Sequence, residues 1–206
     1  MKKAIGSIFV ILSVMTILKV DAQNLKLHPK GYFSARGIDV TVFDDIYPDG
    51  HQTGVTMIQH GERVMANGDL RLEISPGQWS PVPREVEKKI DIATQTISQS
   101  LSYPDETKNR KGFNPIDYPD LKLKYKVNVT PTEGNNFRIT VDLENDVDVK
   151  WLGKIGFNIE LFPGDLFGKS YICDGNFGIF THSPYGPLQA QMDGQNLGTP
   201  LCKGKK

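Results

Sequence analysis

Hydrophobic and polar residues alternate along most of the chain after residue 23. The clearest alternation covers residues 121–129 and 137–143, where Leu, Tyr, Val, Phe and Ile are separated by Lys, Asn, Arg, Thr and Asp. Shorter runs at residues 38–42, 55–64 and 70–74 follow the same period of two. This period is typical of strands that bury one face. We therefore expect an all-β domain built as an antiparallel β-sandwich of about ten short strands, with a partly closed barrel as the alternative.

The two longest runs predict a hairpin. They are joined by the turn-rich segment Thr130–Asn136, which is short enough to connect neighbouring antiparallel strands. Placing Val129 opposite Phe137 sets Lys124 opposite Asp142 and Lys122 opposite Glu144. Such opposite-charge pairs on the solvent face would help to fix the register.

The remaining segments favour strands and loops over helices. Residues 85–100 come nearest to a helix, but their Thr, Ile and Ser content favours an extended conformation. Gly-rich and Pro-rich connections separate the strands, and they span residues 47–50, 75–83, 103–120 and 163–168.

The N-terminus predicts an exported protein. Lys2 and Lys3 precede an apolar stretch that ends at Leu18, and Val20 and Ala22 provide the small residues of a cleavage site. Residues 1–22 are therefore predicted to form a cleavable signal helix. Its apolar stretch is too short to span a bilayer. Residues 23–206 form the predicted domain, with a poorly ordered tail after about residue 188. We expect a periplasmic, outer-surface or extracellular location, without membrane attachment after cleavage.

Charge and cysteine content narrow the possible partners. The chain of 206 residues has 24 basic and 24 acidic side chains, so no net field favours nucleic acid or an anionic membrane. Cys173 and Cys202 are the only cysteines. In an oxidising compartment they can form a disulfide, and two independent thiols are the alternative.

One loop gathers oxygen ligands and an imidazole between residues 43 and 51. Its side chains can bind calcium or sugar hydroxyls, although Asp next to Pro or Gly is also ordinary turn chemistry. Calcium is thus a possible cofactor, and no other metal or cofactor is indicated. The candidate carbohydrate contacts in this loop are Asp44, Asp45, Tyr47, Asp49 and His51.

Two tryptophans are candidate platforms for sugar rings. Trp79 lies in the Pro-rich loop 76–81, which favours exposure, whereas Trp151 precedes Leu152 and Gly153 and can instead cap the core.

No catalytic residue is indicated. Asp44, Asp45, Asp49, Glu160 and Asp174 are available as carboxylates, but nothing in the sequence selects a pair at the separation that glycoside cleavage needs. Motifs for a serine nucleophile, a phosphate-binding loop or a zinc peptidase are absent from the sequence.

Several motifs nevertheless resemble a known family. They are Phe-Asp-Asp-Ile-Tyr-Pro-Asp-Gly-His-Gln-Thr-Gly from residue 43, Gln-His-Gly from residue 59, Ala-Asn-Gly-Asp-Leu-Arg from residue 66, Pro-Gly-Gln-Trp from residue 76, and Gly-Lys-Ile-Gly-Phe-Asn-Ile-Glu-Leu-Phe-Pro-Gly-Asp-Leu-Phe-Gly-Lys-Ser-Tyr from residue 153. Together they resemble the β-region that precedes the catalytic barrel in secreted bacterial glycoside hydrolases similar to family 9.

The resemblance implies a carbohydrate-related module without its own active site. The family's Asp-Ala-Gly-Asp motif is missing, and the strand pattern leaves no room for the (α/α)₆ barrel. We therefore expect a non-catalytic N-terminal portion of a glycoside hydrolase-like protein, from a truncated or split gene, whose partners are a glycan and a separate catalytic domain. The alternatives are a small carboxylate-based glycoside hydrolase complete in itself and a purely structural interaction domain.

Overall fold

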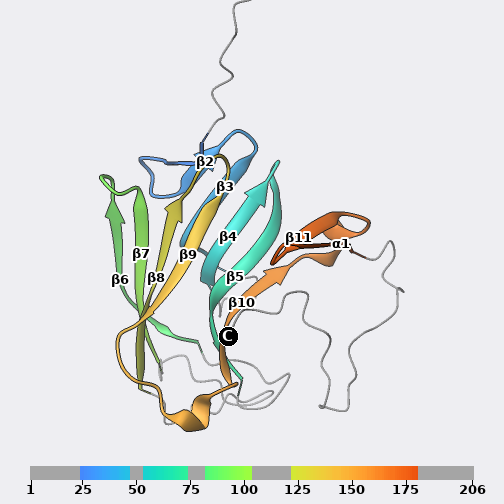
Figure 1. Cartoon of the computed structure of the whole chain (residues 1–206). Coiled ribbons are helices and arrows are strands. Elements are labelled where there is room, and N and C mark those ends of the chain that lie inside the picture. The colour runs from blue at the N-terminus through green and yellow to red at the C-terminus, as the bar shows by residue number, and fades with distance from the viewer. Residues whose placement is uncertain (1–23, 47–52, 74–81, 104–121, 181–206) are drawn as a thin grey trace, which may run out of the picture.

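The computed structural model describes residues 24–46, 53–73, 82–103 and 122–180. Two antiparallel sheets pack face to face, as Figure 1 shows with β6–β9 on one side and β2–β5 on the other. This arrangement confirms the predicted all-β sandwich. The predicted signal helix, the N-terminal domain boundary and the tail after residue 188 lie outside the described residues.

The larger sheet has six strands in the order β1-β2-β3-β4-β5-β10. Five of them follow one another in sequence, and β10 returns to pair with β5. The strands are β1 (Lys26–Leu27), β2 (Phe33–Ala35), β3 (Ile38–Ile46), β4 (Thr53–Gln59), β5 (Glu62–Leu72) and β10 (Ile155–Leu161).

The smaller sheet has four strands joined in sequence order, and a separate ribbon of two strands follows β10. The four are β6 (Arg84–Asp91), β7 (Thr96–Tyr103), β8 (Leu123–Pro131) and β9 (Phe137–Leu143). The ribbon consists of β11 (Ser170–Cys173) and β12 (Asn176–Ile179). Two short helices complete the described chain, the 3-10 helix η2 (Val149–Trp151) and α1 (Pro163–Leu166). No helix in this part of the chain is long and apolar enough to cross a membrane.

The core lies between the two sheets and follows the period-two pattern. In β7 every second residue is buried, and in β8 the same holds from Leu123 to Val129. Burial of these side chains is the main stabilising contribution. The fully buried apolar residues are Phe33, Val40, Val42, Val55, Leu72, Ile97, Leu101, Leu123, Tyr125, Val127 and Val129.

Two hairpins use tight turns with positive φ angles at both central positions. His60 (φ 52°) and Gly61 (φ 86°) connect β4 to β5, and Asp174 (φ 50°) and Gly175 (φ 76°) connect β11 to β12. Such turns match the right-handed twist of the flanking strands. Asp174, one of the available carboxylates, thus forms with Gly175 the Asp-Gly pair of a hairpin turn.

The predicted hairpin between residues 121 and 143 exists, but its register was predicted wrongly. Pro131 lies opposite Phe137 and Val129 opposite Ile139, a shift of two residues from the expected pairing. The strands continue further than expected, and the backbone N–H of Thr132 donates to the carbonyl of Asn136 at 2.9 Å, which closes a shorter loop. Since the shift is even, every side chain keeps its predicted face.

Three other expectations are refined by the structure. The extended conformation of residues 85–100 is confirmed, but it comprises β6, a turn and the start of β7. Val64 and the start of the run at residues 70–74 belong to one strand, β5, which ends at Leu72. In the segment 163–168, expected to be a loop, Pro163–Leu166 form α1.

Candidate functional site

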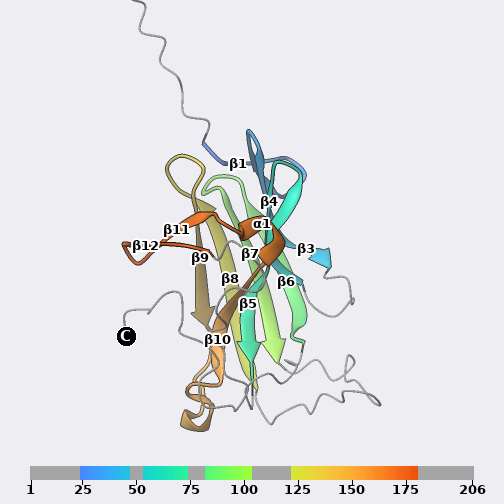
Figure 2. The same ribbon diagram turned by 90° about the vertical axis from the view of Figure 1, so that its right-hand side faces the viewer.

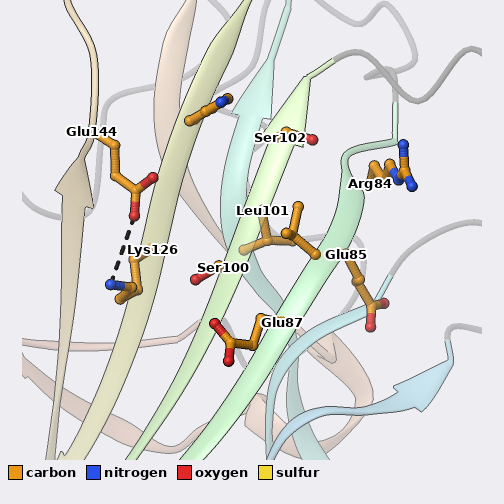
Figure 3. A pocket seen from close by; sticks show the side chains of 10 residues that line it. Arg84, Glu85, Glu87, Ser100, Leu101, Ser102, Lys126 and Glu144 are labelled. Carbon is orange, nitrogen blue, oxygen red and sulfur yellow. Dashed lines mark ion pairs between the residues drawn. The ribbon is translucent and has the colours of Figure 1, made fainter.

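A polar groove lies on the outer face of the four-stranded sheet, directed away from the core (Figure 3). It originates in the sequence of β7, Thr-Ile-Ser-Gln-Ser-Leu-Ser-Tyr, whose inward positions are large and whose outward positions are serine or threonine. Neighbouring strands carry longer outward side chains. The short serines therefore form a floor between two rims.

Strand pairing sets the composition of each rim. Ser102 lies between Arg84 of β6 and Lys124 of β8, so this end of the groove is basic on both sides. One step further along β7, Ser100 lies between Glu87 and Lys126. Facing charges of opposite sign at this second step give the groove both hydrogen-bond donors and acceptors.

The groove has a volume of about 560 Å³, within the range of small-molecule sites. A bulge in β6 between Glu85 and Glu87 makes Val86 the additional residue, and its side chain is 63% exposed at the rim. The lining residues are Arg84, Glu85, Val86, Glu87, Ser100, Leu101, Ser102, Lys124, Lys126 and Glu144.

The hydroxyl groups along β7 differ in how they are used. Near the β6–β7 turn, Thr96 Oγ1 lies 3.0 Å from Thr130 Oγ1, and Ser98 Oγ donates to Asn128 Oδ1 at 2.6 Å. Within the described part of the chain, the hydroxyls of Ser100 and Ser102 make no such side-chain bond. These two hydroxyls of the groove floor are therefore available to a ligand.

One ion pair crosses the β8 side of the groove. Lys126 Nζ lies 3.6 Å from Glu144 Oε1, and both side chains are about two-fifths exposed (39% and 43%). Solvent screening keeps such a pair weak. It therefore leaves both groups able to exchange partners with a ligand.

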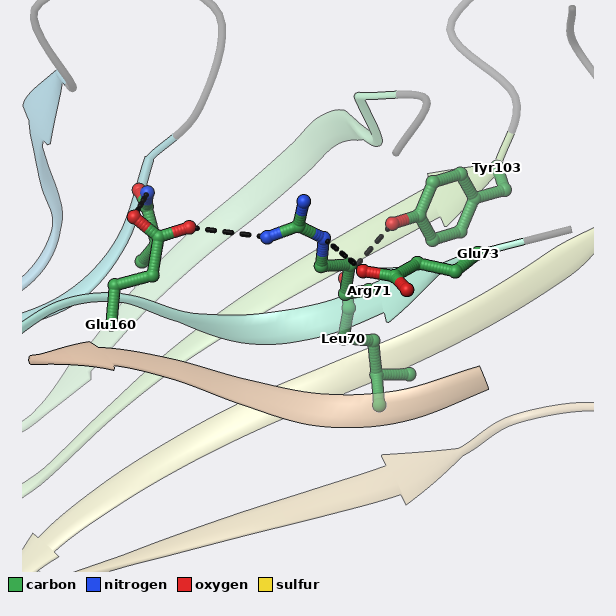
Figure 4. Close-up of polar contacts among 6 residues, drawn as sticks. Leu70, Arg71, Glu73, Tyr103 and Glu160 are labelled. Atoms are coloured by element: carbon green, nitrogen blue, oxygen red, sulfur yellow. Dashed lines mark hydrogen bonds and ion pairs between the residues drawn. The ribbon is translucent and has the colours of Figure 1, made fainter. Parts of the chain in front are cut away.

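A second polar cluster lies between β5 and β10 (Figure 4). Arg71 Nη1 lies 3.2 Å from Glu160 Oε1, and Arg71 Nε lies 3.0 Å from Glu73 Oε1, an ion pair without hydrogen-bond alignment. Asn67 Nδ2 donates to the other oxygen of Glu160 at 3.0 Å. Because two carboxylates already surround the guanidinium, this cluster joins the strands and is not an open anion site.

A buried carboxyl lies under the groove, on the core side. Asp69 is 7% exposed, and both of its oxygens accept from the Tyr125 hydroxyl at 3.0 and 3.1 Å. Burial raises the pKa of Asp69 to about 8, while the hydrogen bonds from the Leu70 N–H and from Tyr125 oppose the shift. The same burial raises the pKa of Tyr125 well above its usual value. Tyr103 stacks on Tyr125 with ring centroids 5.9 Å apart, and its hydroxyl donates to the Leu70 carbonyl.

The structure separates the site residues expected from the sequence. Asp44 lies in β3, 47% of its side chain is exposed, and it pairs with Lys88 of β6 across the two sheets. Asp45 is also in β3, and its side chain lies outside the described part. Tyr47, Asp49, His51 and Trp79 lie outside the described residues altogether.

Trp151 occupies the position that the core-capping alternative predicts. It ends η2, is 7% exposed and belongs to the hydrophobic core. The ammonium groups of Lys150 and Lys154 lie 5.8 and 5.7 Å from its ring. The ring is therefore part of the core, with two cations close to it.

The described residues include only one of the two cysteines and no candidate metal site. Cys173 ends β11 and is not a free thiol, but Cys202 lies outside the described residues, so their pairing stays a prediction. Within the described ranges, no group of three or more His, Cys, Asp or Glu side chains is placed to hold a metal ion.

The groove could not be predicted from the sequence. Its signal was present in the outward serines of residues 98–102, but a groove requires knowledge of the neighbouring strands. Comparison of the chain with known protein families, with curated proteins and with solved structures finds no match. The resemblance to family 9 therefore rests on the motifs quoted above.

Proposed function

We propose that this chain is an exported, non-catalytic module that binds a glycan in the groove over β7. The observation that carries the proposal is the pair of free hydroxyls, Ser100 and Ser102, between charged rims in an open groove. Sugar hydroxyls pair well with such mixed donors and acceptors, because each can donate and accept. The motif resemblance to glycoside hydrolases supports this choice of ligand.

The acids of the groove support binding rather than hydrolysis. A glycosidase requires a general acid whose pKa is raised by burial, beside a second carboxylate. Glu85 and Glu87 are exposed, and Glu144 is paired with Lys126. In this proposal the catalytic step belongs to a separate domain.

Binding is tested by calorimetric titration of the purified chain with soluble oligosaccharides of glucose, mannose, xylose and galacturonate. Ser100→Leu fills the floor of the groove and is expected to weaken binding about tenfold or more. Thr140→Leu is the matched control, because Thr140 is exposed on the outer face of β9 and does not line the groove.

Three outcomes would contradict the proposal. They are the absence of binding to every oligosaccharide, equal binding by wild type and Ser100→Leu, and release of reducing ends by the chain alone. Thermal unfolding of both variants verifies that the sandwich is intact.

A further inference from the structure

The outer edge of β10 has no partner strand among the described residues. β10 is the last strand of the six-stranded sheet, and among the described residues it pairs with β5 alone. Figure 2 faces this edge, with the ribbon of β11 and β12 projecting across its upper end. An open edge presents unpaired backbone N–H and C=O groups that can bind another strand.

Sheet edges in natural proteins are usually protected, and the edge strand β6 shows how. Six of its eight residues are charged, and a bulge interrupts its pairing. Charges and bulges prevent the addition of another strand. The edge strand β9 carries Arg138 and Asp142, and the edge strand β1 has only two residues.

β10 has fewer of these protections, although its pairing with β5 also shifts register between Asn158 and Glu160. Its sequence, Ile-Gly-Phe-Asn-Ile-Glu-Leu, contains one charged residue, no lysine and no proline. Phe157 pairs with Leu70 and Leu161 with Met65, so both share the core side of the sheet. Yet Phe157, Ile159 and Leu161 are 38%, 43% and 40% exposed.

The exposure follows from the unequal size of the sheets. Six strands on one side face four on the other, so the apolar row of β10 continues the core face at the far end of the larger sheet. The neighbouring ribbon adds three more apolar side chains on one face, and they are Ile172 (76%), Phe177 (77%) and Ile179 (63%). Exposed apolar side chains in such numbers are typical of interaction sites.

We propose that β10 pairs antiparallel with β10 of a second copy of this chain and so joins two six-stranded sheets across a two-fold axis. The sequence of β10 is self-complementary when Asn158 lies on that axis. Phe157 then faces Ile159, and Ile155 faces Leu161. The carboxylate of Glu160 faces Gly156 and avoids its own copy.

Charge also favours a second copy as the occupant. Residues 23–206 carry 21 basic and 23 acidic side chains, so two copies experience little net repulsion. A two-fold arrangement also closes the assembly, because both open edges are used in one contact. This inference is independent of the groove, which lies on the other sheet.

The test places charges on the proposed axis. Asn158 is half-buried and pairs with Asp69 of β5, and Asn158→Lys sets two lysines opposite each other on the proposed axis. The full chain, expressed for export and purified, is analysed by sedimentation velocity over a wide concentration range. We expect a wild-type dimer and a dissociation constant about tenfold or more higher for Asn158→Lys.

Two further variants make the test specific. Asn158→Asp alone is also expected to weaken the dimer, whereas an equimolar mixture of Asn158→Lys and Asn158→Asp is expected to restore it as a mixed dimer. Val86→Lys, on the opposite and already charged edge, is expected to leave the dimer intact.

Several results would overturn the proposal. A wild-type chain that is monomeric at every concentration shows that the edge serves another partner or none. A dimer that persists equally in both Asn158 variants, or that is lost in Val86→Lys, places the contact elsewhere. Circular dichroism of each variant excludes unfolding as the cause of dissociation.

Discussion

The two faces of β7 use the same strand for different purposes. The inner face carries Ile97, Gln99, Leu101 and Tyr103, all at most 5% exposed, and holds the two sheets together. The outer face carries small hydroxyl side chains and forms the floor of the groove. The proposed function thus assigns stability and binding to alternate residues, so each can be changed with little effect on the other.

The largest expected difference between the faces concerns the free energy of unfolding. Leu101 is 2% exposed, and Leu101→Ala is expected to cost about 2–5 kcal/mol because it removes buried contacts and leaves a cavity. The adjacent outer variant Ser100→Ala is expected to change stability by less than about 0.5 kcal/mol. Urea denaturation of both measures the contrast, and similar midpoints for the two variants would contradict it.

The next expected effect is a pH dependence of the free energy of unfolding, caused by the buried Asp69 of β5. Because burial raises the pKa of Asp69 to about 8 in the folded chain, the neutral carboxyl stabilises the fold below the ordinary pKa of 3.8. This contribution is lost as the pH rises from about 4 to 8. The expected slope is up to about 1.4 kcal/mol per pH unit.

Asp69→Asn is expected to flatten that slope, since the amide does not titrate. The control is Glu133→Gln, which removes an exposed carboxylate in the β8–β9 loop. Unfolding is measured in urea at closely spaced pH values. A slope that persists in Asp69→Asn would assign the pH dependence to another group.

Gln99 is an exception on the inner face. It is 2% exposed, and its Oε1 has no hydrogen-bond partner among the described residues. Replacing it with the similarly shaped methionine is expected to raise the free energy of unfolding by about 1 kcal/mol, because an unpaired buried oxygen is costly.

Gln95 provides the opposite case. Its side chain accepts from the Leu27 N–H at 2.9 Å and donates to the Ile92 carbonyl at 2.8 Å. Gln95→Met is therefore expected to destabilise the fold, and calorimetric melting compares the two variants. If both variants changed the melting temperature equally, the hydrogen bonds of these two glutamines would not explain their effects on stability.

The smallest expected effect concerns the outer face. A double-mutant cycle on Lys126 and Glu144 is expected to give a coupling of about 0.2–1 kcal/mol that decreases with added salt. A larger, salt-independent coupling would mean that the groove rim is part of the structural framework.

The sequence predicted the strands and their faces because alternation is local information. Leu123 to Val129 reveal their inward positions without any knowledge of their neighbours. Strand register was less accessible, since an even shift satisfies the same pattern, as the displaced pairing of Val129 shows.

The site depends on contacts that no local pattern contains. Ser100 acquires its rims only because β6 and β8 pair on either side of β7. The burial of Asp69 was also inaccessible from the sequence. It follows a bulge at Asn67, whose φ of 52° interrupts the alternation of β5. The sequence around Trp151 was compatible with a sugar-binding platform and with a core residue. Its packing in the hydrophobic core is visible only in the structure.

The central claim is that ligand binding belongs to the outer face of β7. Its most direct test is a titration of the isotopically labelled chain with the oligosaccharide of the panel that binds best, followed through backbone amide chemical shifts. We predict that the largest shifts occur at Ser100, Ser102 and the facing residues of β6 and β8. Shifts confined to the six-stranded sheet, with those amides unchanged, would contradict the claim.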